Sequence, residues 1–200
     1  MKYPGLNSTK FIPWQPSTWP EPPATFDIGF HKNLKRILNE TILKEIYNVI
    51  SDAQSSGQGL VHRGHVVALA MLCAIDAISS YAFPKKNEEC KKCGRSDHIG
   101  PKYKRFISDF FPQDYKPFAK AIYNLYRNSM VHSWNLFKVG ILPGNQPISK
   151  KDGTISFGLL NFFDALKKAT KNFLLCLTDN PALQMASLKR YKELKDSALP

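Results

Sequence analysis

The sequence predicts an all-α protein: a four-helix up-and-down bundle with a small β-hairpin insertion and a proline-rich amino-terminal arm. The first observation is that apolar residues recur every three or four positions over long stretches, which is the period of an amphipathic helix. The second is that glycine, proline and polar residues cluster between these stretches. The third is that only residues 136–157 show the short alternating pattern of strands. Helices packed on helices are therefore the simplest architecture.

Length and charge narrow the class of protein. The 200 residues are enough for one domain with an arm and for a hydrophobic core without disulfides. The 28 Lys and Arg residues exceed the 16 Asp and Glu residues, which gives a net charge of +12. This charge favours a polyanionic partner, either nucleic acid or an acidic membrane surface. A basic soluble protein without such a partner is the alternative.

The apolar segments do not predict a secreted or membrane-inserted protein. The amino terminus is proline-rich and has no apolar core of a signal peptide. The longest apolar run, residues 66–75, is too short to span a bilayer. The expected protein is cytoplasmic and has no membrane partner. Two of its four cysteines, Cys73 and Cys176, fall in apolar helical patterns, which also favours a reducing compartment.

The first part of the chain divides into an arm and a long helix. Residues 1–26 contain six prolines with Trp14 and Trp19 between them, so no regular helix is expected there. The tryptophans favour an arm that lies across the domain or a neighbouring one, and a free tail is the alternative. Residues 27–200 form the helical domain. Its first helix is expected over residues 31–54, with Leu43 and Tyr47 on the apolar face.

A second helix is expected over residues 62–83, where small and apolar residues on nearly every side predict a central position in the bundle. Residues 84–101 form a polar insertion that carries Cys90, Cys93 and His98. This spacing resembles half of a zinc site, and structural zinc needs four ligands. A dimer or a distant histidine (His31, His62 or His65) would have to complete it. A loop of free thiols and a redox pair are the alternatives.

The remaining elements follow in order. A short helix is expected over residues 103–111, and a longer one over residues 115–132, with Asp114 as its cap and Pro117 tolerated in its first turn. Residues 136–157 predict a hairpin around a polar loop. Two helices, over residues 158–177 and 181–194, complete the chain.

The carboxyl end of the third main helix carries the strongest chemical signal. Arg127 and Asn128 are followed by His132. Cleavage of RNA by its own 2′-hydroxyl needs a group with a pKa near neutrality to move a proton, which His132 supplies. It also needs a fixed cation for the charge that builds on the phosphate oxygens, which Arg127 supplies. Asn128 would orient the imidazole or the phosphate. This chemistry requires no metal or cofactor.

Arg127 and His132 do not share a face of an ideal helix. At 100° per residue they are separated by about 140°. The helix must loosen near His132, or the Arg127 side chain must wrap around it. The alternative is structural: Arg127 caps and solubilises the helix while His132 packs against its neighbours.

The segment RNSMVH, Arg127 to His132, resembles the R-x4-6-H motif of the HEPN superfamily, in which a polar residue commonly follows the arginine. The order of helices over residues 31–178 is similar as well. The resemblance implies a metal-independent endoribonuclease that dimerises so that two motifs face one another, and a role as a toxin or in defence against phage. It implies catalytic roles for Arg127 and His132, a supporting role for Asn128, and regulation by a cognate antitoxin or another protein. A catalytically inactive HEPN-like module that binds RNA or protein is the alternative.

Further residues are candidates for contacts with RNA. Lys102 and Lys104 would hold the phosphate backbone, or else solvate a loop. Arg63 and His65 open the second helix and would line the same cleft, or else form an ordinary polar helix start. Tyr123 and Tyr126 would stack a base or pack in the core.

Overall fold

A computed structural model describes residues 19–55, 59–83, 99–125 and 139–197. The fold is mostly helical with a small sheet, as the sequence predicts. The elements in chain order are α1 (Ile28–Arg36), the π-helical η2 (Ile37–Leu43), α2 (Lys44–Ser55), α3 (Gly59–Ala82), α4 (Ile99–Phe110), the 3₁₀-helical η3 (Gln113–Phe118), α5 (Ala119–Asn124), β1 (Val139–Leu142), β2 (Ser149–Lys151), β3 (Thr154–Gly158), α6 (Leu159–Asp179) and α7 (Pro181–Asp196).

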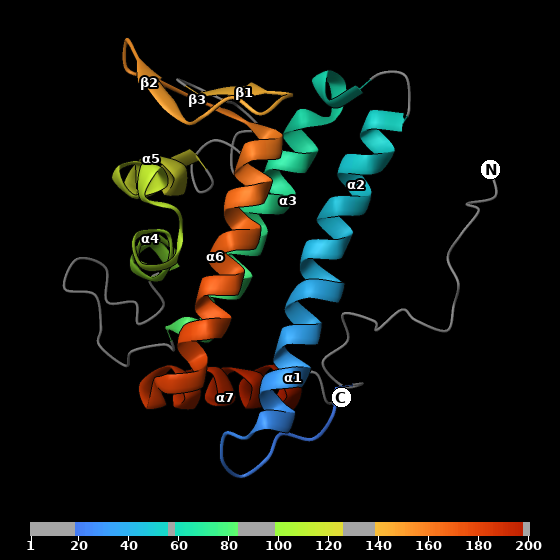
Figure 1. The fold of residues 1–200 in the computed structure, drawn as a ribbon, viewed down its shortest axis with the longest axis vertical. Helices are drawn as coiled ribbons and strands as arrows, with labels where there is room; N and C mark the ends of the chain where they lie inside the picture. The colour runs from blue at the N-terminus through green and yellow to red at the C-terminus, as the bar shows by residue number, and fades with distance from the viewer. Residues whose placement is uncertain (1–18, 56–58, 84–98, 126–138, 198–200) are drawn as a thin grey trace.

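Three long helices form the body of the molecule. Figure 1 shows α2, α3 and α6 running alongside one another, with α7 across their lower end and the sheet across their upper end. Helix α4 packs on α3 and α6, and α5 packs on α4; both are seen nearly end-on. The described residues therefore establish a helical core, while the four-helix up-and-down bundle stays a prediction.

The first helix is continuous from α1 through η2 to α2, but it is not α-helical throughout. Buried positions run through the π segment at Ile37, Leu38, Thr41 and Leu43 and continue at Ile46 in α2. A π turn contains more residues than an α-helical turn, so it shifts the buried face relative to an unbroken α-helix. The expected apolar face is therefore wrong at Tyr47, whose side chain is 50% exposed.

Helix α3 is less enclosed than its composition predicts. Its interior positions Met71, Leu72, Ile75 and Ile78 are buried, but Val66 is 51% exposed. The predicted central position is thus wrong for one side of the helix. Within the described ranges, Arg63–Ala82 is the single segment long and apolar enough to cross a membrane, and 56% of its most apolar window is buried inside the fold. The core helix of a soluble protein has the same properties.

The predicted helix over residues 115–132 starts differently. Residues Gln113–Phe118 form a 3₁₀-helix, and α5 begins only at Ala119. Pro117 lies inside this 3₁₀ segment, before α5 begins. Asp114 lies inside the 3₁₀ turn, and the residue at its N-cap position is Pro112, so the predicted cap is wrong.

The hairpin predicted over residues 136–157 is wrong in its pairing: its first and last strands, β1 and β3, lie parallel, and the hairpin partner of β3 is β2, which falls in the predicted loop. Strands β2 and β3 do form an antiparallel hairpin, and Asp152 and Gly153 join them with φ values of 50° and 77°. Positive φ at both central residues is typical of a type I′ turn. The third strand, β1, pairs in parallel with β3 on its other side, which gives the order β1-β3-β2. A parallel neighbour was missed because pairing between strands distant in the chain leaves no local pattern.

An aromatic cluster joins α4 to α6. The ring of Phe110 lies 5.6 Å from that of Phe173, and the ring of Phe106 lies 6.2 Å from it. The amide of Asn172 donates a hydrogen bond of 2.9 Å to the carbonyl of Phe110. These contacts bury large apolar surfaces, so they fix α4, and the α5 that follows it, against the core.

Residues 19–26 pack on α1 and α7. Trp19 is only 3% exposed, and its ring lies 5.1 Å from that of Tyr191. The Tyr191 hydroxyl donates to the carbonyl of Pro20, and the Lys195 ammonium donates to the carbonyl of Trp19 at 2.6 Å. Lys195 also forms a 2.7 Å ion pair with Glu21. The end of the proline-rich arm is thus anchored by aromatic packing and by charged hydrogen bonds.

Buried tyrosines make the fold sensitive to alkali. Burial raises the pKa of Tyr191 to about 12 and raises the pKa of Tyr81 and Tyr115 above their usual range. A group whose pKa is raised in the folded state contributes stability that is present below its unfolded pKa, near 10, and lost as the pH rises through the folded pKa. We therefore expect the free energy of unfolding to fall from about pH 10 upward.

Tyr81→Phe tests this expectation because no described residue accepts a hydrogen bond from the Tyr81 hydroxyl. The variant should match or exceed the wild-type stability at pH 7 and lose less of it between about pH 9 and pH 11. Urea unfolding followed by circular dichroism at each pH measures both. An equally steep alkaline loss in the variant and the wild type would contradict a role for Tyr81.

Candidate functional site

The predicted catalytic residues lie outside the described residues. Arg127, Asn128 and His132 fall in the segment 126–138, between the end of α5 and the start of β1. The structure describes the two elements that flank this segment in the chain, α5 before it and β1 after it.

Helix α5 is held against α4 on the first flank. Ile122 and Leu125 are buried, and the ring of Tyr123 lies 5.6 Å from that of Tyr103. A Cβ added at Gly100 would lie 2.9 Å from the Tyr123 hydroxyl oxygen, so the absence of a side chain there lets the tyrosine approach closely. Tyr123 is half-buried, which makes it a packing residue with one accessible edge.

Two predicted RNA-binding lysines belong to this flank. The Lys104 ammonium lies 5.9 Å from the centroid of the Tyr123 ring, within cation–π range. Lys102 is half-buried on the same helix, α4. The structure therefore brings Lys104 to Tyr123, a few residues before Arg127 in the chain.

The second flank is β1 and the start of α3. Gly64 faces β1 and α6: a Cβ added there would meet the Leu159 side chain at 3.2 Å and the Ile141 side chain at 3.7 Å. Arg63 and His65, on either side of Gly64, are exposed. They therefore lie at the end of α3 that packs on β1, the strand that follows the motif segment.

Lys104 thus lies on α4, which packs on α5, the helix before the motif segment. Arg63 and His65 lie at the end of α3 that packs on β1, the strand after it. Cations at both places favour an anionic ligand.

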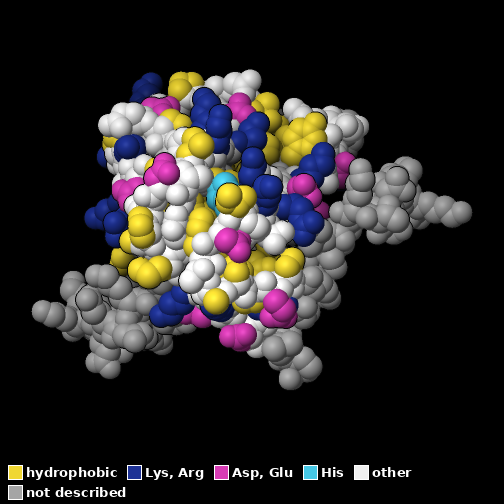
Figure 2. All heavy atoms as spheres, turned by 60° about the horizontal axis from the view of Figure 1, so that its bottom comes forward, with side chains coloured by type: hydrophobic (Ala, Val, Ile, Leu, Met, Phe, Trp, Pro, Cys, Tyr) yellow, Lys and Arg dark blue, Asp and Glu magenta, His cyan; other side chains and the backbone are white. Residues whose placement is uncertain are grey.

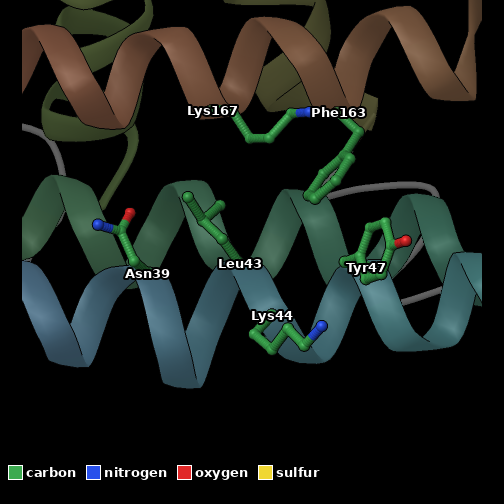
Figure 3. Close-up of a pocket in the computed structure, with 6 residues that line it drawn as sticks. All are labelled: Asn39, Leu43, Lys44, Tyr47, Phe163 and Lys167. Carbon is green, nitrogen blue, oxygen red and sulfur yellow. The ribbon is translucent and has the colours of Figure 1, made fainter.

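A shallow groove between the first helix and α6 is a feature that the sequence did not predict. Its volume is about 390 Å³. Six residues line it: Asn39, Leu43, Lys44, Tyr47, Phe163 and Lys167. Figure 3 shows Leu43, Tyr47 and Phe163 extending between the two helices, while Lys44 runs along its own helix toward Tyr47. The groove was missed because the apolar period of an unbroken α-helix assigns Tyr47 to the core, whereas the residue is 50% exposed. The sequence signal that could have indicated the groove is Lys44, which stands three residues before Tyr47 and is therefore its neighbour on the helix surface.

Cations gather on part of the molecular surface. Figure 2, in which the lower end of Figure 1 comes forward, shows lysine and arginine side chains in a band next to hydrophobic ones. Among the ion pairs of the described residues, Lys167 with Asp164 and Arg105 with Asp109 are exposed. Exposed pairs of this kind contribute little stability and leave the cation accessible to another anion.

The predicted zinc ligands Cys90, Cys93 and His98 lie in the segment 84–98, outside the described residues. The Nε2 of His31, one candidate for completing the site, donates to the carbonyl of Leu174 at 3.2 Å. Over the ranges that the structure describes, no three His, Cys, Asp or Glu side chains are grouped as metal ligands would be. No protein-family model, curated protein or solved structure matches the chain.

Proposed function

We propose that this chain is a metal-independent endoribonuclease of HEPN type, with Arg127 and His132 as catalytic residues and Asn128 as a supporting one. The observation that carries the proposal is the motif Arg127-Asn128-x3-His132 in a chain of net charge +12. The side chains of Lys104 and Tyr123 on one flank and of Arg63 and His65 on the other support it, because they suit an RNA strand that crosses the motif.

The reaction uses the RNA as its own nucleophile. The 2′-hydroxyl attacks the adjacent phosphorus, the bond from phosphorus to the 5′-oxygen breaks, and the products are a 2′,3′-cyclic phosphate and a 5′-hydroxyl. His132 takes the proton of the 2′-hydroxyl or, as imidazolium, protonates the leaving oxygen. The Arg127 guanidinium stabilises the charge that builds on the non-bridging oxygens.

The proposal includes a HEPN-like four-helix arrangement and a homodimer. Among the described elements, its helices would be α1 to α2, α3 and α6. In a homodimer, two motifs would face one another across a shared basic cleft. A cytoplasmic role as a toxin or in phage defence, held in check by a cognate antitoxin or regulatory protein, follows from the same resemblance.

Cleavage of mixed RNA in the presence of EDTA tests the proposal. The wild type is expected to cut RNA and leave 2′,3′-cyclic phosphate ends, and His132→Ala is expected to be slower by about 10²- to 10⁴-fold. Arg127→Gln should fall in a similar range because it removes the phosphate cation. An oligonucleotide with 2′-deoxyribose at every position should stay intact, since it lacks the nucleophile.

The controls separate this function from its alternatives. Circular dichroism must show that the His132→Ala fold is intact. If the folded wild type cuts RNA no faster than His132→Ala, the enzymatic proposal fails. Salt-sensitive retention of RNA without products would instead indicate the inactive RNA-binding module. Stoichiometric zinc, with loss of fold on chelation, would indicate an interaction protein held together by Cys90, Cys93 and His98.

A further inference from the structure

We propose that the groove between η2–α2 and α6 is a second RNA-binding site, which holds a single-stranded segment. The inference rests on the proposed function for the identity of the strand as RNA. Its physical basis is separate, because it depends on the described side chains Asn39, Lys44, Tyr47, Phe163 and Lys167 and not on Arg127 or His132.

The groove pairs aromatic rings with cations on both walls. The Lys44 ammonium lies 4.7 Å from the centroid of the Tyr47 ring, and the Lys167 ammonium lies 4.9 Å from that of the Phe163 ring. Figure 3 shows the Lys167 side chain running along α6 toward Phe163, on the opposite wall from Tyr47. Single-stranded nucleic acid is bound by this combination, since bases stack on aromatic rings while lysines contact the phosphates.

The accessibility of Tyr47 is the feature that a purely structural role does not explain. Its side chain is 50% exposed, while Phe163, across the groove, is 5% exposed. Lys44 covers the Tyr47 ring from its own helix, and the remaining ring surface is open to a base. A groove volume of about 390 Å³ falls within the usual range of small-ligand sites, about 300 to 1,000 Å³, and suits a nucleotide.

The π segment contributes two side chains to this site. Asn39 and Leu43 belong to η2, and Ile46 of α2 is buried in the core. Tyr47, the next residue, is thereby left on the surface beside the groove. π-helical segments within α-helices are frequently found at functional sites. The Asn39 amide, which lines the same groove, offers both a donor and an acceptor for a base edge.

Charge on the two walls favours a polyanion over a neutral ligand. Among the described residues, the groove is lined by two cations, Lys44 and Lys167, and by no acidic residue. The helical segments 32–47 and 163–171, which contain its walls, carry seven exposed cations (Lys32, Lys35, Arg36, Lys44, Lys167, Lys168 and Lys171) and three exposed acidic residues (Glu40, Glu45 and Asp164). Asp164 is paired with Lys167 at 2.6 Å, but both side chains are about half exposed. Such a pair is weak enough for an RNA phosphate to replace the carboxylate.

The test uses a fluorescein-labelled single-stranded RNA of about twelve nucleotides with 2′-O-methyl groups, which the proposed chemistry cannot cleave. Fluorescence anisotropy gives Kd for the full-length protein between about 50 and 200 mM salt. Tyr47→Leu should raise Kd by about five-fold or more because it removes a stacking surface, while Tyr47→Phe should leave Kd nearly unchanged.

The charge contribution has a matched control. Lys44→Gln combined with Lys167→Gln should reduce the slope of log Kd against log salt by about 1.4, as expected for two lost phosphate contacts. Lys150→Gln combined with Lys151→Gln removes the same charge from the exposed strand β2 and should change the slope much less. Equal effects of the two double variants, or equal binding by Tyr47→Leu and the wild type, would overturn the inference.

Two further measurements separate this inference from the proposed function. If unmodified RNA is never cut but the groove variants still lose affinity, the nuclease proposal fails and the groove stands. If anionic lipid vesicles bind with dependence on Tyr47 and the RNA does not, the groove is a membrane contact and the inference is wrong.

Discussion

Gly158→Ala is expected to destabilise the protein by about 3 kcal/mol or more, because the added methyl group has no room. A Cβ at this position would lie 2.3 Å from the carbonyl oxygen of Gly144 and 2.5 Å from the amide nitrogen of Gln146. Both are backbone atoms, so they cannot turn aside as a side chain would. The Gly158 amide also donates to the carbonyl of Gln146 at 2.9 Å, and a shift that relieves the clash would break this bond.

Urea unfolding followed by circular dichroism measures this effect, and Gly153→Ala is its control. Gly153 has φ of 77° but nothing within 4 Å of an added Cβ, so its substitution should cost only the backbone conformational energy, about 1 kcal/mol. If Gly158→Ala were no worse than Gly153→Ala, the close packing around the end of β3 would be contradicted.

The substitution should also lower RNA cleavage if the proposed function is right. β3 pairs with β1 from Val139 to Leu142, and β1 begins immediately after the segment that contains His132. Loss of the β3 end therefore removes the anchor for the chain that leaves the motif. We expect Gly158→Ala to lose activity while Gly153→Ala retains it.

Trp19→Ala is expected to lower the free energy of unfolding by about 3 kcal/mol, the usual cost of removing a buried aromatic side chain. The Trp19 ring is 3% exposed and packs on Tyr191, which also contacts Phe30 at 5.2 Å. The loss should extend beyond the arm, because α1 and α7 share these contacts. Thermal and urea unfolding of the wild type and the variant measure it.

Tyr191→Phe is the control for Trp19→Ala. It keeps the aromatic packing and removes only the hydrogen bond to the carbonyl of Pro20, so it should cost about 1 kcal/mol at pH 7. Should Trp19→Ala unfold at the same urea concentration as the wild type, residues 19–26 would not contribute to the stability of the domain.

Much of the helical framework could be predicted from the sequence. Of the six predicted helices, the five that lie wholly within the described ranges are observed within a few residues of their expected bounds. Examples are α6 (Leu159–Asp179) and α7 (Pro181–Asp196). Local periodicity is sufficient for such helices because each hydrogen-bonded turn involves neighbouring residues. Asp152-Gly153 likewise marks its turn by residue type alone, since both residues tolerate positive φ.

Part of the candidate site could likewise be predicted from the sequence, and part could not. Arg127, Asn128 and His132 could be singled out because they are close in the chain, and their convergence stays a prediction. The meeting of Lys104 with Tyr123, and of the start of α3 with β1, joins residues far apart in the sequence. No periodic pattern in the sequence predicts these contacts, because periodicity relates only residues that are close in the chain.

The sequence by itself determined the helical class, the basic charge and the Arg-His motif, because composition and local spacing suffice for each. Only the tertiary structure decided that Tyr47 faces a groove, that β1 lies parallel to β3, and that Trp19 is buried on α7. These three features have the same physical reason. A π turn shifts the face of a helix by one residue, and strand pairing and aromatic packing depend on which distant surfaces meet, so these features follow from the packing of the whole chain.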